Sequence, residues 1–337
     1  MGAVRLKDVA DACGVSIATV SRALNGLAPA GSRLTAMICM TAREMGYIPN
    51  AAALTLKTSR SNNIGILYEN QLNHEYFSSL LDDFRREARI RGYDITLFGG
   101  KAEGEDEQEN YSEHARRKNL DGVIVLQADF ESVEVIRLAT NAKPTVVIDH
   151  LYDGCDCVSS DNQESIRKLV RYARERGHSR IGYITGEDGA VTRERLAGFY
   201  KACAEMGIRV PEGFVRAGHF HEPEDCARHL RELAAGPDGA TCVLCPDDFS
   251  CLGAMWKLKE EGMQIPDALS LIGYDGIRMG QMILPHLTTY RQDTARIAAE
   301  TLDLLTDAIE NPETHSTRQV IVEGALIEGN TVCELCR

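Results

Sequence analysis

The sequence lacks any hydrophobic run long enough to cross a membrane, since no apolar stretch approaches the roughly 18–20 residues of a spanning helix. Its first residues, MGAVRLKDVADAC, carry charges where a signal peptide requires an unbroken apolar stretch. The eleven cysteines are odd in number and irregularly spaced, unlike a disulfide framework. We therefore expect a cytoplasmic protein whose cysteines stay reduced.

The short motifs of catalysis are also missing: there is no P-loop, GxGxxG, HExxH or GxSxG. Metal-ligand residue types do occur, in HFHEP (219–223), CVLC (242–245) and CELC (333–336). On an extended strand, however, Cys242 and Cys245 would face opposite sides, which no single zinc ion could use. Buried apolar cysteine is the favoured interpretation, and we expect no enzyme activity, no cofactor and no metal site.

Positive charge is scarce overall, with 37 Lys+Arg against 50 Asp+Glu and a net charge of −13. Residues 1–60 differ, because they carry seven basic and three acidic side chains, a net of +4, which leaves −17 for the rest. This asymmetry excludes a uniformly basic nucleic-acid coat. It fits one small positive module that contacts DNA and is attached to an acidic body.

The first 48 residues have the pattern of three short helices. The first covers Leu6 to Cys13 and is followed by Gly14 as a turn residue; the second runs from Ser16, as N-cap, to about Leu24. The third begins at about Arg33, behind Ser32 as cap, and stops at Gly46. We expect its packing face to contain Leu34, Met37, Ile38, Ala42 and Met45.

Residues 6–25 satisfy the spacing of a helix-turn-helix. Ala10 is small where the two helices cross, and Gly14, four residues on, can take the positive φ of the turn. Val15, Val20 and Ala23 supply the apolar contacts between the helices. An ordinary three-helix packing unit without a DNA role is the alternative interpretation.

The second helix would present its first turns to the major groove. Arg22 can bridge guanine O6 and N7, while Ile17 and Ala18 offer apolar contact, as to a thymine methyl. Short hydroxyls suit phosphate oxygens, and the segment provides Ser16, Thr19 and Ser21.

From residue 63 the pattern alternates between strands and helices, which predicts parallel sheets with helices on both faces. About nine strands in some 270 residues suit two doubly wound sheets better than one. The strand-like runs are Ile64–Tyr68, Asp94–Phe98, Gly122–Leu126, Thr145–Ile148, Ile181–Thr185, Val215–Phe220, Cys242–Cys245 and Leu269–Gly273. We expect an N-terminal all-α helix-turn-helix domain followed by an α/β core of two such sheets.

Several motifs carry a resemblance to a known family. They are DVADACGVSIATVSRALN, AREMGYIPN, AAALTL, VSSDN, GHSRIGYITG, RLAGFYKA, LSLIGYDG and LTTYRQD. Together they make the whole chain resemble the LacI/GalR family of bacterial transcriptional regulators. The resemblance implies that Ile17, Ala18 and Arg22 read an operator, with Asn25 at the end of the reading segment.

The resemblance also implies a hinge helix in the linker 49–61, formed when two chains sit on DNA. Leu56 would wedge into the minor groove at the operator centre, with Ala53 beside it. Two departures remove expected phosphate contacts: Leu54 stands where the family often has Arg, and Arg33-Leu34-Thr35 rearranges the usual Thr-Arg. Both imply weaker and less salt-dependent binding.

The implied core resembles periplasmic sugar-binding proteins, with two α/β lobes joined by three crossovers. We place the crossovers near 158–161, 287–293 and 318–321. The domains are then 1–48, the hinge 49–61, and the core 62–337, with an N-lobe at about 62–159 and 291–319 and a C-lobe at about 160–289 and 320–331. Because the chain ends at TVCELCR without a leucine heptad, a homodimer is expected.

The effector would bind between the lobes, at the carboxyl ends of the strands. Carboxylates that accept from adjacent hydroxyls and an arginine that donates in a fixed fork favour a neutral polyol, hence a sugar, over a purine or a phosphate. A helix N-cap role is the alternative for each aspartate. The candidate residues are Arg195, Asp275, Asp149, Asp247, Tyr76, Phe77, Phe220 and His221.

The resulting hypothesis is a homodimeric repressor of carbohydrate-utilisation genes that leaves a palindromic operator when a mono- or disaccharide binds. Ligand binding would close the lobes and melt the hinge helices, coupling two sites through one bistable element. Two alternatives stay open: a cytoplasmic sugar-binding protein, and a ligand-activated or co-repressed regulator that responds to a non-sugar metabolite.

Overall fold

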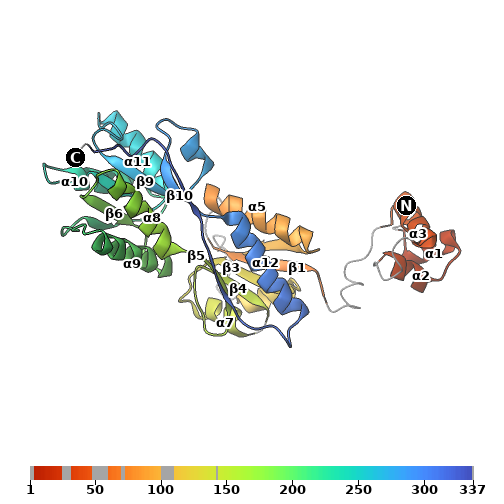
Figure 1. Cartoon of the computed structure of the whole chain (residues 1–337). Coiled ribbons are helices and arrows are strands. Elements are labelled where there is room, and N and C mark those ends of the chain that lie inside the picture. The colour runs from red at the N-terminus through yellow and green to blue at the C-terminus, as the bar shows by residue number, and fades with distance from the viewer. Residues whose placement is uncertain are drawn as a thin grey trace. The chain divides into compact units, whose positions relative to one another are not determined.

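The computed structural model describes residues 4–24, 32–47, 60–69, 73–99, 110–141 and 143–335. The chain divides into two compact units, Met1–Ser61 and Asn62–Arg337 (Figure 1). Each unit has its own apolar core, and the two are described separately. Within the described residues, no helix combines the length and apolar character that a bilayer span requires.

The first unit is a three-helix domain made of α1 (Leu6–Cys13), α2 (Ile17–Leu24) and α3 (Arg33–Glu44). Helix α1 ends at Gly14, whose φ of 64° lies in the left-handed region that glycine adopts most easily. Ser32 caps α3 by accepting a hydrogen bond from the Thr35 N–H at 3.0 Å. The buried core consists of Val9, Ala10, Val20, Ala23, Ile38 and Ala42.

The second unit contains two lobes, each built on a six-stranded sheet (Figure 1). The N-lobe sheet has the order β11-β5-β4-β3-β1-β2, and all its strand pairs are parallel. Its central strands are apolar throughout because helices cover both faces. The elements are β1 (Asn63–Tyr68), α5 (Glu75–Ile90), β2 (Asp94–Phe98), α6 (Tyr111–Arg117), β3 (Gly122–Gln127), α7 (Val133–Asn141), β4 (Thr145–Ile148), β5 (Asp156–Ser160), α12 (Thr294–Glu310) and β11 (Gln319–Val322).

The C-lobe sheet has the order β12-β10-β9-β8-β6-β7. Its pairs are parallel except for β10 with β12, which run antiparallel. The elements are α8 (Asn162–Glu175), β6 (Ile181–Thr185), α9 (Ala190–Glu205), β7 (Val215–Ala217), α10 (Pro223–Ala234), β8 (Cys242–Leu244), α11 (Asp248–Glu260), β9 (Ser270–Asp275), the 3-10 turn η1 (Arg278–Gln281), β10 (Thr288–Arg291) and β12 (Ala325–Ile327).

The chain passes between the lobes three times: from β5 to α8, from β10 to α12, and from β11 to β12. The third passage corrects our prediction, because β11 pairs with β5 through residues 319–322 and therefore belongs to the N-lobe. The crossing lies at Glu323 and Gly324 instead of at 318–321. Strands β11 and β12 are short and lack the alternation of apolar and polar residues from which their positions in the sheets could have been predicted.

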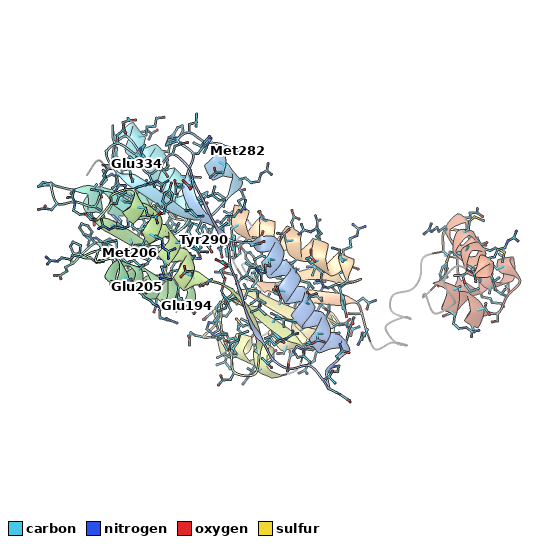
Figure 2. All side chains as sticks on the ribbon, viewed as in Figure 1. Glu194, Glu205, Met206, Met282, Tyr290 and Glu334 are labelled. Atoms are coloured by element: carbon cyan, nitrogen blue, oxygen red, sulfur yellow. The ribbon has the colours of Figure 1, made fainter. Side chains whose placement is uncertain are left out.

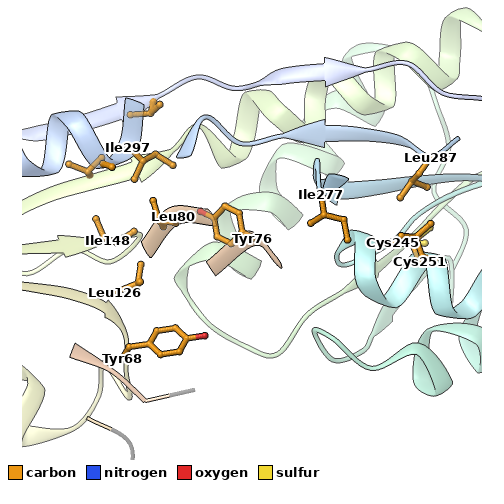
Figure 3. Close-up of a cluster of buried hydrophobic side chains, with 14 of the residues drawn as sticks. Tyr68, Tyr76, Leu80, Leu126, Ile148, Cys245, Cys251, Ile277, Leu287 and Ile297 are labelled. Atoms are coloured by element: carbon orange, nitrogen blue, oxygen red, sulfur yellow. The ribbon is translucent and has the colours of Figure 1, made fainter. Parts of the chain in front are cut away.

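The expected architecture of a helical N-terminal region and two parallel α/β lobes is confirmed. The apolar core of the second unit is continuous between the lobes. Figure 3 shows Tyr76 between the N-lobe side chains Leu80 and Ile148 and the C-lobe side chain Ile277, all members of one buried cluster. The lobes are thus in contact at the site where we expect the effector.

Candidate functional site

Helix α2 presents the surface that the sequence predicts for reading DNA. Ser16, Ile17, Ala18 and Arg22 are exposed, while Val20 and Ala23 on the opposite face are buried in the three-helix core. The Ile17 side chain is 48% exposed, so it is available for an apolar contact. The exposure is what a major-groove contact requires.

Some of the hydroxyl groups in and before this helix already make hydrogen bonds within the domain. Ser16 precedes α2 and accepts the Thr19 N–H at 3.1 Å, so it serves as the N-cap. The Ser16 and Thr19 hydroxyls lie 2.8 Å apart, and Ser21 is half-buried. The DNA roles of these residues stay predictions.

Three predicted DNA contacts, Asn25, Ala53 and Leu56, lie outside the described residues. Most of the expected hinge 49–61, including Leu54, lies outside them as well. Within α3, the expected packing face is wrong in part. Leu34 and Met37 are 43% and 39% exposed, whereas Ile38 and Ala42 are buried.

Between the lobes, polar side chains from both sheets gather around Arg195 of α9. This side chain is 6% exposed and donates through Nε to Asn162 Oδ1 at 2.9 Å. Its guanidinium lies flat against the Tyr274 ring, with Cζ 3.5 Å from the ring centroid. No described residue accepts a hydrogen bond from its two terminal nitrogens.

Asp275 is the last residue of β9 and lies close to this arginine. Its φ of 106° is in the region that favours glycine, so the chain holds the carboxylate in a strained turn. Gln292 Nε2 donates to Asp275 Oδ1 at 2.8 Å. Burial raises the pKa of Asp275 to about 7, against the lowering effects of Arg195 and Gln292.

Asp149 occupies the corresponding place in the N-lobe, immediately after β4. It also has a positive φ, 56°, and its carboxylate accepts the Ser160 N–H at 3.0 Å. Burial raises its pKa to about 6, although Ser160 and Arg195 act in the opposite direction. Neither Asp149 nor Asp275 caps a helix, so the alternative interpretation does not apply to these two.

Gln292 connects the lobes in the middle of this group. Its Oε1 accepts hydrogen bonds from the Ser160 hydroxyl and, at 3.3 Å, from Tyr76. Its Nε2 donates to Asp275. We call Arg195, Asp149, Asp275, Gln292 and Tyr76 the interlobe cluster.

Asp247 fulfils the alternative interpretation, that of a helix N-cap. It is 1% exposed and caps α11, accepting from the Ser250 N–H and hydroxyl at 2.8 Å each. It also accepts the His221 N–H at 2.9 Å. Asp247 therefore also positions the segment that contains His221, and its contact with the effector stays a prediction.

The predicted aromatic residues border the interlobe cluster. Phe77 packs edge-on to Tyr76 with ring centroids 5.1 Å apart. Phe220 lies over Gly186, where an added Cβ would be 2.0 Å from the ring, and Arg195 Cζ is 6.0 Å from the centroid of the same ring. Tyr76, Asp149 and Asp275 thus lie near Arg195, with Phe220 beside it, while Phe77 contacts Tyr76 and His221 contacts Phe220.

Comparison with known proteins decides the family. Residues 5–50 match the family of bacterial regulatory proteins, lacI family, and residues 170–332 match the periplasmic binding protein-like domain. The chain is 30% identical over 334 residues to the HTH-type transcriptional repressor PurR of Escherichia coli O139:H28 (strain E24377A / ETEC), which covers 98% of this chain and 97% of that protein. The chain belongs to the LacI family.

Solved structures agree on the fold of this LacI-family chain. The Lac repressor dimer bound to operator and the anti-inducer ONPF matches with a TM-score of 0.81 at 21% identity, covering 98% of this chain and 100% of that one. A complex of the transcriptional regulator CelR with cellobiose matches with a TM-score of 0.72 at 23% identity, covering 97% and 99%. The chain is a DNA-binding transcriptional regulator with a ligand-binding core.

Sequence reasoning missed several residues of the LacI-family core that shape the site. Asn162 and Tyr274 hold Arg195, and Gln292 joins the lobes. Each lies within a motif that carried the family resemblance, VSSDN, LSLIGYDG or LTTYRQD. A single Asn, Tyr or Gln does not indicate such a role by its chemistry, so these residues could have been predicted only from the family motifs.

The prediction of buried cysteines is confirmed for Cys242 and Cys245, whereas Cys333 is only partly buried and Cys336 lies outside the described residues. Cys226, Cys242, Cys245 and Cys251 are each 3% exposed or less, and burial contributes to a raised pKa at Cys242 and Cys251. At Cys251 the hydrogen bond with Cys245 acts in the opposite direction. Among the described residues, no three His, Cys, Asp or Glu side chains come together in a way that could hold a metal ion.

Proposed function

We propose that this LacI-family protein represses carbohydrate-utilisation genes and leaves its operator when a small neutral sugar binds the interlobe cluster. The observation that carries the proposal is the buried Arg195 between the carboxylates of Asp149 and Asp275. An arginine with free terminal nitrogens and two carboxylates with free lone pairs offer donors and acceptors to a ring of hydroxyl groups.

The charge of the cluster favours a neutral ligand. One guanidinium faces two carboxylates, so an anionic group such as a phosphate would meet uncompensated negative charge once both are ionised. The Phe220 ring can pack against the apolar face of a sugar. Two structural neighbours hold sugars according to their descriptions: CelR with cellobiose and an Enterococcus faecium regulator with ribose.

A homodimer completes the proposal, because a palindromic operator requires two reading helices. The exposed apolar side chains of η1 and the following loop offer the contact surface. Met282 and Leu284 are each 72% exposed, and Met279 and Ile283 are 49% and 39% exposed. Figure 2 shows Met282 projecting from the C-lobe. Four apolar side chains so close together mark an interaction surface.

The test is a thermal-denaturation panel of mono- and disaccharides, sugar phosphates and nucleobases with the full chain. A cognate sugar at about a hundred times its Kd adds about 2.7 kcal/mol of stability, which raises the Tm by roughly 5–10 °C. Stabilisation by nucleobases alone would favour the alternative, a regulator that responds to a non-sugar metabolite.

Variants connect that shift to the proposed site. Asp275→Asn keeps the shape and tolerates the positive φ but removes the charge, so the sugar-induced shift should disappear. Asp267→Asn, on an exposed residue of the same lobe, should leave the shift unchanged. An unchanged shift in Asp275→Asn would contradict the assignment.

A further inference from the structure

Two histidines from opposite lobes stack against each other beside the interlobe cluster. His74 precedes α5 in the N-lobe, and His221 lies between β7 and α10 in the C-lobe. Their ring centroids are 3.6 Å apart and their planes differ by 22°. Because the two rings belong to different lobes, this contact exists only while the lobes are together.

A second contact crosses the lobes at the next residue. The Glu75 carboxylate accepts the backbone N–H of Arg278 at 2.7 Å and that of Met279 at 3.4 Å. His74 and Glu75 therefore hold the start of α5 against two separate C-lobe segments. These two amide protons report directly on whether the lobes are joined.

The surroundings of the imidazole pair are mostly apolar. The Phe249 ring is edge-on to both, at 6.2 Å from His74 and 6.3 Å from His221, and Phe77 approaches His221 at 6.4 Å. The Nδ1 atoms of both histidines are buried and have no hydrogen-bond partner among the described residues. A neutral ring leaves only a weak acceptor unsatisfied there, whereas a protonated ring would leave a buried cationic N–H unsatisfied.

The two histidines differ in their charged neighbours. Asp247 Oδ1 lies 3.6 Å from His221 Nδ1, so a proton on His221 would gain an ion pair. His74 has no such carboxylate within ion-pair distance among the described residues, and a proton on it would face the neighbouring imidazole. The charged groups around the pair are thus Asp247 from α11 and Glu75 from α5, and only the former is directed at a ring nitrogen.

We propose that His74 and His221 form a pH-sensitive clasp, which holds the lobes together while His74 is neutral and releases them when His74 is protonated. This rests on the proposed function in one respect: a ligand that binds between the lobes has to change the contact between them. The direction agrees with the environment: burial and the charge of His221 lower the pKa of His74 below its ordinary 6.5, and Asp247 only partly opposes them. A group whose pKa is lowered in the closed form favours opening as the pH falls below 6.5.

Hydrogen–deuterium exchange of the ligand-free full chain tests the clasp without requiring an effector or DNA. The readout is the protection of the Arg278 and Met279 amides, relative to their intrinsic exchange rates, at pH 7.5 and 5.5. In the unmodified chain we expect these amides to lose protection in acid, because the pKa of His74 is lower in the closed form than in the open form. A chain equally protected at both pH values would overturn the clasp, whatever sugars it binds.

Variants separate His74 from the other groups that titrate in this range. His74→Phe keeps a ring that can stack but cannot be protonated, so protection should be the same at both pH values. His74→Leu removes the stacking and should give lower protection that is also independent of pH. His219→Phe, on an exposed histidine two residues before His221, should retain the acid-induced loss. An acid-induced loss that persists in His74→Phe would assign the effect to Asp149 or Asp275 and refute the proposal.

Discussion

Asp149 and Asp275 are buried near Arg195. Their pKa values therefore depend on the loss of solvation as well as on the charge of the guanidinium. Burial raises the pKa of Asp149 to about 6 and that of Asp275 to about 7, even with a guanidinium nearby. In the free protein, Asp275 is therefore about half ionised at neutral pH. A ligand whose hydroxyls donate to a carboxylate will favour the ionised form and lower both pKa values.

This predicts a pH-dependent affinity for the sugar. Because binding lowers a pKa that starts near 7, the contribution of Asp275 is fully present above pH 7 and is lost as the pH falls through 7, by up to about tenfold per pH unit. Calorimetric titration between pH 8 and 6 in the His74→Phe chain, where the clasp does not titrate, measures it. Asp275→Asn should show no binding at either pH; a sugar affinity of the His74→Phe chain that increases in acid would contradict this prediction.

His315 is a second residue whose charge matters, and it acts on stability. Its Nε2 is 2.7 Å from Asp156 Oδ2 and its Nδ1 is 2.8 Å from Asp307 Oδ2. Burial alone would lower the pKa of His315, but the hydrogen bonds and charges of the two aspartates raise it. The pair of contacts fixes the loop between α12 and β11 in the N-lobe.

Replacing this histidine should destabilise the core in a pH-dependent way. Because the pKa is raised in the folded state, the stabilisation is complete below the unfolded pKa of about 6.5 and is lost as the pH rises through the folded value. His315→Gln should lower the free energy of unfolding by about 2 kcal/mol at pH 6 and by less at pH 8.5, measured by urea denaturation. Glu313→Gln, exposed on the same loop, is the control. A loss that grows with pH would refute this assignment.

At the scale of elements, α2 is the helix on which DNA specificity depends. Its exposed side, Ile17, Ala18 and Arg22, contains one charged residue, so discrimination at a guanine should depend on Arg22. The neighbouring α3 carries Arg43 in its last turn, where the side chain is exposed. Arg22 and Arg43 carry the same charge, so Arg43 can serve as the control for a substitution of Arg22.

Arg22→Ala should weaken binding to the selected operator by about 1–3 kcal/mol and relax the preference at one base pair of each half-site. Arg43→Ala should weaken all sequences alike, because it can contribute only to the phosphate attraction. The operator is first obtained by in vitro selection with the full chain, and affinities are then measured by fluorescence anisotropy at fixed salt. Equal losses on all sequences for Arg22→Ala would contradict its reading role.

Some strands of the two sheets could be predicted from the sequence, and others could not. Long apolar runs such as β1 and β3 were predictable because burial on both faces leaves a continuous signal. Strands β5, β10 and β11 are short and partly polar, β12 has only three residues, and the pairing of all four depends on distant segments. Strand β7 ends at Ala217 instead of Phe220, since the chain then turns through the positive φ of His221.

At the scale of the whole molecule, the DNA-reading unit is small and the acidic core is large. A single basic unit with a net charge of +4 gains limited affinity from phosphates, so two units must act together. In the proposed homodimer, contacts between the cores of the two copies should therefore affect operator binding. The exposed Met279, Met282, Ile283 and Leu284 are the candidates.

Leu284→Glu should convert the dimer to a monomer, because a charge would be buried in an apolar contact. Sedimentation velocity should show the change in mass, and operator affinity should fall steeply while sugar-induced thermal stabilisation remains. Leu151→Glu, on an equally apolar residue of the N-lobe that is 54% exposed, should remain dimeric. A dimeric Leu284→Glu variant would move the interface elsewhere.

The residues of the candidate site could be predicted where they lie within motifs of the family. Arg195 and Asp275 followed from the family resemblance, and the structure places them together. That Asp247 caps α11 could not be decided from the sequence, because a carboxylate after a strand can face a ligand or cap the next helix, and only its contact with Ser250 shows the cap. The contact between His74 and His221 could not be predicted either, because 146 residues lie between them and they belong to different lobes. Local sequence patterns do not show how the two lobes meet.

The central claim is that sugar binding at the interlobe cluster lowers the affinity for the operator. Fluorescence anisotropy of the full chain on its selected operator, with and without the sugar that stabilises it most, measures this coupling directly. The account predicts that the operator Kd increases by roughly 5–150-fold when the sugar is saturating, and that Asp275→Asn abolishes the increase. An operator Kd that stays constant or decreases on sugar addition would contradict it.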